Sequence, residues 1–215
     1  MTRLWRRLIG LGCRLLYNEL AWLYDLVAWV TSLGLWRRWA RTAAGFLPEG
    51  GRVLEVAFGP GHLLAYLAGA GYQVAGLDLS RNMVRLAMRR LRKRRLAAAL
   101  VRGRAEELPF APAAFDAIVL TFPTPFVYDP KWLAQARRVL RPGARFVVVE
   151  VATFERAGAA GRVLEWAYAV TGQRGGSPSP LAARLEEAGF RAWRERVEVE
   201  RTTVELVVAE VVEEQ

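Results

Sequence analysis

The sequence predicts an α/β domain in which a doubly wound, mostly parallel sheet ends in an antiparallel C-terminal hairpin. Three observations support this prediction. Short runs of aliphatic and β-branched residues alternate with helical patterns, which is the order of βαβ units. The first run leads through closely spaced glycines into a helical pattern, as at the nucleotide-binding edge of a parallel sheet. The last two runs are separated only by a polar turn, which favours a hairpin.

The elements follow in order along the chain. Strands are predicted at residues 52–57, 73–78, 97–101, 115–121 and 144–151, then after Gly189 and over 202–212. Helical periodicity is found over residues 63–70, 81–95, 129–140 and 180–188. An Arg-Pro-Gly triplet at 141–143 should end the third of these helices, because proline and glycine do not continue a helix. Residues 172–180, rich in glycine, serine and proline, are predicted to form a mobile loop near the substrate side.

Length and composition fit one soluble domain with a sizeable core and an appendage, since 53% of the 215 residues are hydrophobic and 24% are charged. The single cysteine, Cys13, excludes an internal disulfide and a cysteine-rich metal site, and it fits a reducing, cytoplasmic compartment. His62 is the only histidine, so zinc chemistry is not expected and no metal site is predicted.

The net charge of +10 comes almost entirely from arginine, because Lys93 and Lys131 are the only lysines among 31 basic residues. Nucleic acid, an anionic membrane or an acidic small molecule would all match this charge, and so would a solvated surface. Many of the arginines fall on the helix predicted over 81–95. Their spacing spreads them around that helix, which favours a solvated face over a dedicated patch.

The first 46 residues form a distinct segment that contains five of the eight tryptophans. Asp25 is the only charged residue in the apolar run 20–36, and a central aspartate costs about 3 kcal/mol in a bilayer, so a transmembrane helix is disfavoured. The apolar stretch 8–13 is too short for a signal peptide and is followed by Arg14. We therefore expect residues 1–46 to form an aromatic, basic helical cap that covers a pocket, lies on a membrane surface or does both, followed by a catalytic domain over 47–215.

A glycine loop at residues 55–62 is the main candidate for a ligand site. Gly59 and Gly61 would let the backbone approach a ligand, and the N–H groups of the following helix would face it. Asp78, which ends the next strand about twenty residues later, could hold ribose hydroxyls. A dinucleotide and S-adenosylmethionine both fit this geometry. The second is favoured, because a dinucleotide fingerprint needs glycine where Leu64 stands, and Glu55 would repel a pyrophosphate but accept an ammonium group.

From roughly residue 52 to residue 150, the chain resembles the class I S-adenosylmethionine-dependent methyltransferases. The matching motifs are the acidic glycine loop at 55–61, the ribose turn at 76–80 with Met83, the adenine loop at 104–110, the fourth strand at 115–119 and the turn before the fifth strand at 138–144. The resemblance implies a Rossmann-like, seven-stranded sheet. It also implies S-adenosyl-L-methionine as cofactor and S-adenosyl-L-homocysteine as product.

Two positions depart from the family pattern. Ala57 replaces the first loop glycine, which is tolerable if φ stays below zero, although its methyl group would crowd the methionine moiety. Arg104 replaces an aspartate and cannot accept a hydrogen bond from adenine, so the backbone near Ala105 and the Glu106 side chain would have to substitute. The cofactor-binding residues implied by the resemblance are Glu55, Ala57, Gly59, Gly61, Asp78, Leu79, Met83, Ala105, Glu106 and Thr121.

Residues 24–26, 32–34 and 36–38 are similar to the entry segment of the ubiquinone and menaquinone biosynthesis methyltransferases, which folds over the cofactor. This makes Tyr24 and Asp25 candidates for catalytic residues, although Tyr24 could equally be a core aromatic residue. Tyr128 is a third candidate, at the expected rim of the pocket. His62 is expected to cap or pack the first helix rather than to act as a base.

The loop after the fourth strand, residues 121–128, reads TFPTPFVY and lies where this family binds its acceptor. It lacks the Asn/Asp-Pro-Pro-aromatic signature of enzymes that methylate nucleic-acid amines, so a nucleic-acid partner is disfavoured. An apolar acceptor is favoured, which predicts a methyltransferase of a hydrophobic small molecule, such as a quinone precursor or lipid, near the inner face of the membrane. A water-soluble acceptor and a cofactor-binding module without turnover are the alternatives. The oligomeric state stays open.

Overall fold

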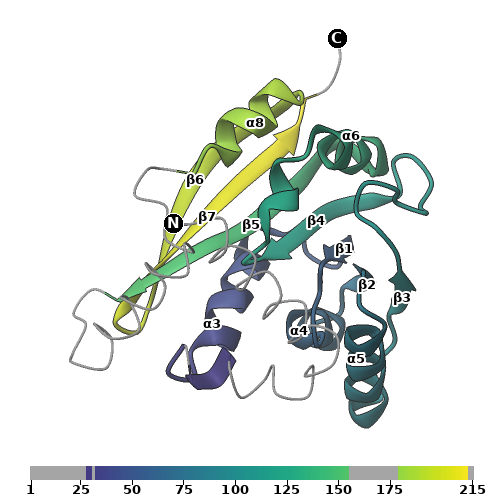
Figure 1. The fold of residues 1–215 in the computed structure, drawn as a ribbon, viewed down its shortest axis with the longest axis vertical. Helices are drawn as coiled ribbons and strands as arrows, with labels where there is room; N and C mark the ends of the chain where they lie inside the picture. The colour runs from purple at the N-terminus through teal and green to yellow at the C-terminus, as the bar shows by residue number, and fades with distance from the viewer. Residues whose placement is uncertain (1–27, 31, 155–178, 213–215) are drawn as a thin grey trace, which may run out of the picture.

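Seven strands form a single sheet in the order β3-β2-β1-β4-β5-β7-β6 (Figure 1). The computed structural model describes residues 28–30, 32–154 and 179–212. The strands are β1 (Arg52–Val56), β2 (Gln73–Asp78), β3 (Ala99–Arg102), β4 (Phe115–Thr121), β5 (Leu140–Phe154), β6 (Phe190–Val199) and β7 (Thr202–Val211). The helices are α3 (Trp36–Arg41), α4 (His62–Gly69), α5 (Arg81–Arg94), α6 (Pro130–Val139) and α8 (Leu181–Glu187), with 3₁₀ turns η2 (Thr42–Phe46) and η3 (Pro125–Tyr128).

The first five strands are parallel, and the last two run antiparallel to their neighbours. The predicted doubly wound sheet with a C-terminal hairpin is therefore confirmed. From β1 the chain first winds outward through β2 and β3, and it then crosses to β4 on the other side of β1. In sheets of this kind, ligands bind beyond the carboxyl ends of the strands at such a switch point.

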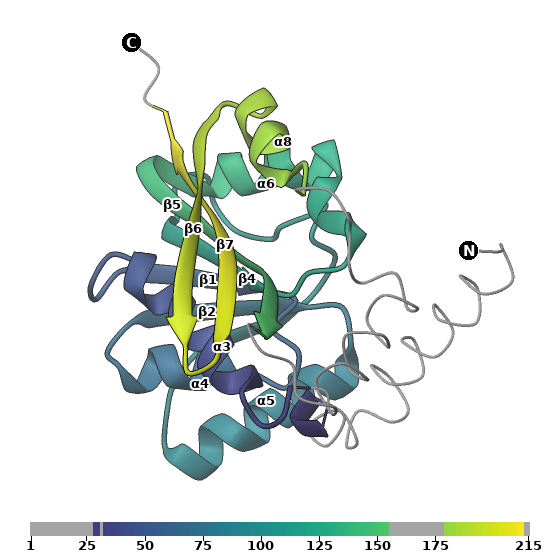
Figure 2. The same cartoon turned by 90° about the vertical axis from the view of Figure 1, so that its left-hand side faces the viewer.

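Helices cover both faces of the sheet. In Figure 2, α3, α4 and α5 lie on one side of it, and α6 and α8 lie on the other. Adjacent residues of β1 belong to different hydrophobic clusters, because side chains alternate along a strand: Val53 packs with Trp39 and Leu64, whereas Leu54 packs with Trp132. A sheet covered on both faces explains why its central strands read as continuous apolar runs.

The region around residues 140–154 differs from the prediction. The Arg-Pro-Gly triplet does follow the end of α6, but β5 already begins at Leu140, which lies opposite Phe115. Gly143, with φ +70°, and a shift of register after Phe115 accommodate the irregular start. At the other end, β5 continues to Phe154 because it pairs with β7 as far as Thr202. The pairing partner, about fifty residues later, extends this strand beyond its predicted end.

Residues 36–46 of the predicted N-terminal cap are packed against the body of the molecule, whereas Trp29, Val30 and Leu33 are exposed. Trp39 in α3 is 2% exposed, and its indole N–H donates to Oγ1 of Thr202 at 2.9 Å. Ala40 and Ala43 are also buried. Residues 36–46 therefore contribute to the core, and the boundary between residues 46 and 47 stays a prediction. Of the helices formed by the described residues, none is both long and apolar enough to cross a bilayer.

Candidate cofactor and acceptor site

A cavity of about 320 Å³ lies at the carboxyl ends of β1, β2 and β4, where the strand order reverses. The loop after β1 forms one wall, the end of β2 a second, and the segment after β4 together with α3 a third. This is the position at which the sequence predicts a cofactor site. The fold places the acidic ends of two neighbouring parallel strands at the same edge.

Glu55 of β1 lines this cavity and is 2% exposed. The backbone N–H of Leu64 hydrogen-bonds to its carboxylate, but Oε2 has no hydrogen-bond partner among the described residues. Burial, and to a smaller extent the negative charge of Asp78, raises the pKa of Glu55 well above its ordinary value. A buried carboxylate oxygen without a partner is costly, so the cavity is chemically complete only when a donor reaches Glu55.

Asp78 ends β2 and is 8% exposed. Its Oδ2 accepts a hydrogen bond from the backbone N–H of Gly59 at 2.9 Å, and its Oδ1 accepts one from the N–H of Ser80 at 2.8 Å. Burial raises the pKa of Asp78, and these two hydrogen bonds oppose the shift. Each carboxylate oxygen has a further lone pair, so Asp78 can anchor the glycine loop and still accept hydroxyl donors.

The two predicted loop glycines have different roles. Gly59, with φ +55°, lines the cavity, and a Cβ added there would meet no atom within 4 Å. Its backbone is therefore open to a ligand, as predicted. Gly61, with φ +72°, is not among the lining residues, and a Cβ on it would lie 2.7 Å from Cβ of Ala87 in α5. Gly61 is required where α4 and α5 meet.

The structure corrects the expectation of a negative φ at Ala57. The sequence suggested that alanine is tolerable there if φ is negative, but φ is +55°. This left-handed conformation costs a residue with a Cβ about 1–2 kcal/mol. The N–H of Ala57 donates to the carbonyl of Leu77 at 2.8 Å, and the residue is exposed and lines the cavity.

Of the other residues predicted to bind the cofactor, some line the cavity and others do not. Leu79, which is 61% exposed, and Thr121 both line the cavity. Met83 is fully buried in α5 and does not line it. Ala105 and Glu106 are also absent from its walls, and Glu106 pairs with Arg104 at 3.1 Å. Their adenine-binding role stays a prediction.

The structure adds an aromatic wall that the sequence did not single out. The ring centroids of Trp36 in α3 and Phe122 after β4 lie 4.1 Å apart, and both residues line the cavity together with Phe126. Phe122 has φ +49°, and its N–H donates to the carbonyl of Val149 at 2.7 Å. We call Trp36, Phe122 and Phe126 the aromatic wall. The only sequence signals for it were the tryptophan-rich segment and the aromatic loop, which are separated by eighty-odd residues.

The catalytic candidates are not assembled in the described part of the chain. Tyr24 and Asp25 lie outside the described residues. Tyr128 does not line the cavity, and its hydroxyl is 3.3 Å from Oγ of Ser179, which donates to Glu150 at 2.5 Å. His62 lines the cavity at the start of α4. The catalytic roles of Tyr24, Asp25 and Tyr128 stay predictions.

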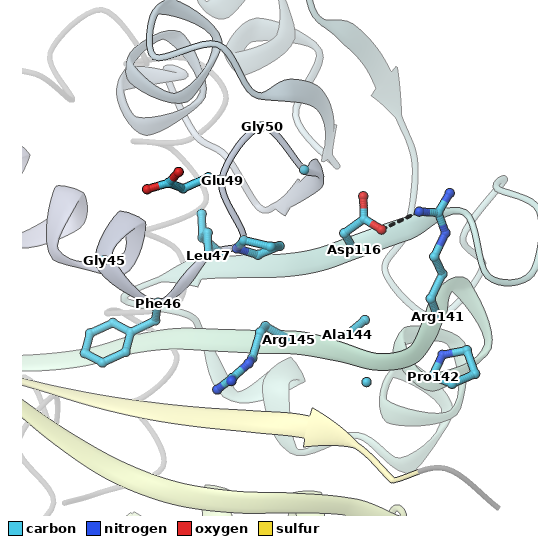
Figure 3. Close-up of a pocket in the computed structure, with 13 residues that line it drawn as sticks. Gly45, Phe46, Leu47, Glu49, Gly50, Asp116, Arg141, Pro142, Ala144 and Arg145 are labelled. Atoms are coloured by element: carbon cyan, nitrogen blue, oxygen red, sulfur yellow. Dashed lines mark hydrogen bonds and ion pairs between the residues drawn. The ribbon is translucent and has the colours of Figure 1, made fainter.

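A second cavity, of about 630 Å³ and more open to solvent, lies at the opposite edge, where β1 and β4 begin (Figure 3). Asp116 forms an ion pair with Arg141 there and accepts a hydrogen bond from the N–H of Arg52 at 2.8 Å. Arg145 also lines this cavity and pairs with Glu210 at 3.5 Å. These polar groups hold the starts of strands together. In the described ranges, no buried polar atom without a hydrogen-bond partner belongs to a residue that lines this second cavity. The cavity of about 320 Å³, which Glu55 lines, is therefore the better candidate for a ligand site.

The smaller cavity fits S-adenosylmethionine. Glu55 offers an anionic acceptor for the ammonium group, Asp78 offers acceptors for ribose hydroxyls, and the open backbone at Gly59 allows close approach. Among the described residues, no cluster of three or more histidine, cysteine, aspartate and glutamate side chains is arranged to hold a metal.

Residues 53–143 match the profile of the methyltransferase domain family. Over 139 residues the chain is 39% identical to the demethylmenaquinone methyltransferase of Renibacterium salmoninarum, covering 63% of this chain and 56% of that protein. It is 38% identical over 146 residues to the 2-phytyl-1,4-naphtoquinone methyltransferase of Synechococcus elongatus, covering 63% of this chain and 62% of the relative. The ubiquinone/menaquinone biosynthesis C-methyltransferase UbiE of a Geobacter species is 33% identical over 152 residues, covering 67% and 65%. The chain thus spans less than two thirds of the length of these relatives.

Solved structures share the fold. A SAM-dependent methyltransferase from Aquifex aeolicus has a TM-score of 0.58 at 23% identity, covering 80% of this chain and 88% of that one. The [4+2]-cyclase SpnF has a TM-score of 0.60 at 18% identity, covering 82% and 80%. Because a cyclase shares this architecture, the fold alone does not define the reaction. The motifs, the cavity and the sequence matches together identify residues 53–143 as a class I S-adenosylmethionine-dependent methyltransferase domain, in a chain similar to the ubiquinone and menaquinone biosynthesis methyltransferases.

Proposed function

We propose that the chain is a methyltransferase that transfers a methyl group from S-adenosylmethionine to a hydrophobic small molecule, of the quinone-precursor or lipid class, at the cytoplasmic face of a membrane. The principal support is the buried Oε2 of Glu55, which lacks a partner among the described residues and lines the same cavity as Asp78. An amino-acid ammonium group joined to a ribose matches these two carboxylates.

The residues around the cavity would hold the cofactor at three points. Glu55 binds the ammonium group, Asp78 binds ribose hydroxyls, and Gly59 lies against the ligand through its backbone. The bound cofactor supplies an electrophilic methyl group on a sulfonium centre. What remains for this chain is to align the acceptor and to exclude water, which can account for a large share of the rate in a displacement reaction.

The aromatic wall supports an apolar, ring-containing acceptor. Trp36, Phe122 and Phe126 present aromatic surface to the cavity, and the apolar Pro123 also lines it. A flat ring could stack on this surface and displace water from it. The names of the relatives include a demethylmenaquinone and a 2-phytyl-1,4-naphthoquinone methyltransferase, which are enzymes of acceptors with such a ring.

The ionisable groups at the described walls are few. Glu55 and Asp78 are assigned to the cofactor, which leaves His62 at the start of α4 as the remaining titratable lining residue. A carbon acceptor activated by its own ring hydroxyl would need little further acid–base help from the protein. The lack of a dedicated base among the described residues that line the cavity is therefore compatible with an apolar acceptor.

The proposal is tested by incubating the purified chain with radiolabelled S-adenosylmethionine and a reduced demethylnaphthoquinone, with Glu55→Gln as the matched inactive control. We expect label in the quinone fraction with the wild type and a strong reduction with the variant. Binding of S-adenosylhomocysteine without label transfer to quinone, lipid or water-soluble acceptors would favour a second candidate, a cofactor-binding module without turnover. The presence of Ala57, a residue with a side chain, at a positive φ in the wall of the cavity is the observation that supports this second candidate.

A further inference from the structure

We propose that the exposed face of α5 docks on an anionic lipid bilayer next to the mouth of the cavity. This inference rests on the proposed function, because docking there would let an apolar acceptor pass from the bilayer into the site. The proposed binding partner is a phospholipid surface with anionic headgroups.

The first observation is the arrangement of basic residues on α5. Four exposed arginines and one exposed methionine recur at intervals of three or four residues and so share one side of the helix. They are Arg81, Arg85, Met88, Arg89 and Arg92, which we call the arginine face. The opposite side holds the buried residues Met83, Ala87 and Leu91. The helix is thus amphipathic, as surface helices are, and these four of its arginines lie on the side away from the core.

The charge of the arginine face is not neutralised by neighbours. Helix α5 contains no acidic residue, and no ion pair formed within the described ranges involves these four arginines. Exposed arginines elsewhere differ: Arg184 pairs with Glu187 at 2.9 Å, and Arg196 pairs with Glu205 at 3.3 Å. An uncompensated cationic stripe attracts an external anion, which a paired arginine does much less.

The second observation is the apolar surface around the same edge. Leu79 is 61% exposed, lines the cavity and directly precedes the N-cap of α5. Met88 on the arginine face is 40% exposed. Arg102 donates through Nε to the carbonyl of Leu79 at 3.2 Å, which adds a further cation at the mouth.

Apolar side chains are also exposed on the α3 side of the cavity. Trp29, Val30 and Leu33 are 63%, 53% and 53% exposed and precede Trp36, which lines the cavity. In Figure 1, α3, α4 and α5 lie along the same face of the sheet. Cations beside exposed apolar groups match the two layers of a bilayer surface, with guanidinium groups at the phosphates and apolar groups below them. A nucleic acid would use the charge but leave Leu79, Met88 and Trp29 exposed to water.

The test is flotation of the full 215-residue chain with vesicles of phosphatidylglycerol and phosphatidylcholine, compared with vesicles of phosphatidylcholine alone. The informative variant combines Arg85→Gln, Arg89→Gln and Arg92→Gln. Its control combines Arg184→Gln, Arg191→Gln and Arg196→Gln, which removes the same charge from α8 and β6, at the opposite edge of the sheet. The substituted side chains are all exposed, so both variants should fold.

We expect the wild type and the control to bind the anionic vesicles, and the α5 variant to bind them roughly 100-fold more weakly, since each basic residue near an anionic surface contributes about tenfold or less. Equal binding by the two variants, or equal binding of the wild type to uncharged vesicles, would overturn the proposal. So would tight binding to a DNA duplex that the α5 variant loses, without any vesicle binding.

Failure of docking and failure of the proposed function give different results. Calorimetric titration with S-adenosylhomocysteine, and methylation of a short-chain, water-soluble demethylnaphthoquinone, do not depend on a bilayer. Both should be unchanged in the α5 variant. Vesicle binding through α5 in a protein that binds no S-adenosylhomocysteine would contradict the methyltransferase proposal and leave the docking surface standing.

Discussion

At the scale of single residues, the site depends on two buried carboxylates that have different tasks. Both carboxylate oxygens of Asp78 accept a backbone hydrogen bond, from Gly59 and Ser80, whereas Glu55 keeps one oxygen without a partner among the described residues. Asp78 therefore shapes the loop before any ligand arrives. Glu55 stays destabilising in the empty cavity and becomes favourable only when a cation binds. This contrast predicts opposite effects of mutation on stability and on binding.

Glu55→Gln should weaken binding of S-adenosylhomocysteine about tenfold or more, because it removes a charge-assisted hydrogen bond to the ammonium group. The same variant should be at least as stable as the wild type at neutral pH. The pKa of Glu55 is raised in the folded protein, so its proton is held to higher pH than in the unfolded chain, and the free energy of unfolding falls as the pH rises between the two pKa values.

Denaturant unfolding and calorimetric titration at several pH values check this. Affinity in the wild type should rise as the pH rises through the raised pKa of Glu55, since Glu55 must lose its proton to receive the ammonium group, and this rise should be smaller in the variant. A variant that is clearly less stable and binds equally well would assign Glu55 to the fold instead of to the ligand.

Ala57→Gly should stabilise the protein by about 0.5–1 kcal/mol, because glycine adopts φ +55° without strain but loses more backbone entropy on folding. It should also strengthen binding of S-adenosylhomocysteine, since a methyl group leaves the cavity wall. Ala113→Gly is the matched control: Ala113 has φ +50° but does not line the cavity. It should give the gain in stability without the gain in affinity. Equal affinity changes in the two variants would show that the Ala57 methyl group does not obstruct the ligand.

At the scale of elements, the glycine loop and α4 are held by contacts of different kinds. Gly59 faces the cavity and Gly61 faces α5, although only one residue separates them. The aromatic wall similarly joins α3 to the segment after β4. These junctions could not be found from the sequence, because the spacing of glycines and aromatic residues does not say which neighbour each will meet.

Gly61→Ala should destabilise the protein by about 1–3 kcal/mol, because its new Cβ would lie 2.7 Å from Cβ of Ala87. Gly59→Ala meets no atom, so it should cost only the strain of its φ, about 1–2 kcal/mol, and weaken cofactor binding instead. Thermal unfolding and titration of both variants separate the two roles. Combining Gly61→Ala with Ala87→Gly should recover part of the lost stability. An absence of any recovery would contradict a direct contact between α4 and α5 at these residues.

Trp36→Leu should raise the KM for a naphthoquinone acceptor about 3- to 10-fold, which corresponds to the loss of one aromatic contact, with little change in the affinity for S-adenosylhomocysteine. Trp193→Leu serves as control, since Trp193 lies on β6 next to Arg145 and far from the cavity. Steady-state kinetics with a saturating methyl donor measure the effect. A fall in cofactor affinity without a change in KM would move the aromatic wall from the acceptor to the cofactor.

At the scale of the whole molecule, the order of strands and helices followed from the sequence because each element has a local signature. Alternating apolar runs, the glycine loop and the acidic ends of β1 and β2 depend on near neighbours in the chain. The position of the cofactor cavity followed from the same signals, because the carboxyl ends of parallel strands must meet at one edge.

What escaped prediction depends on contacts between distant segments. The extension of β5 to Phe154 depends on pairing with β7, and the burial of Trp39 depends on its packing against Phe154 and its hydrogen bond to Thr202. The positive φ of Ala57 could not be inferred either, because alanine rarely adopts it and only the surrounding loop enforces it.

The central claim is that the cavity at the ends of β1 and β2 binds S-adenosylmethionine through its two carboxylates. Calorimetric titration of the wild type, Asp78→Ala and Glu55→Gln with S-adenosylhomocysteine tests it most directly. We expect one site per chain in the wild type, and a loss of about 1–3 kcal/mol of binding free energy when either carboxylate is removed. No binding by the wild type, or equal affinity in all three proteins, would contradict the claim.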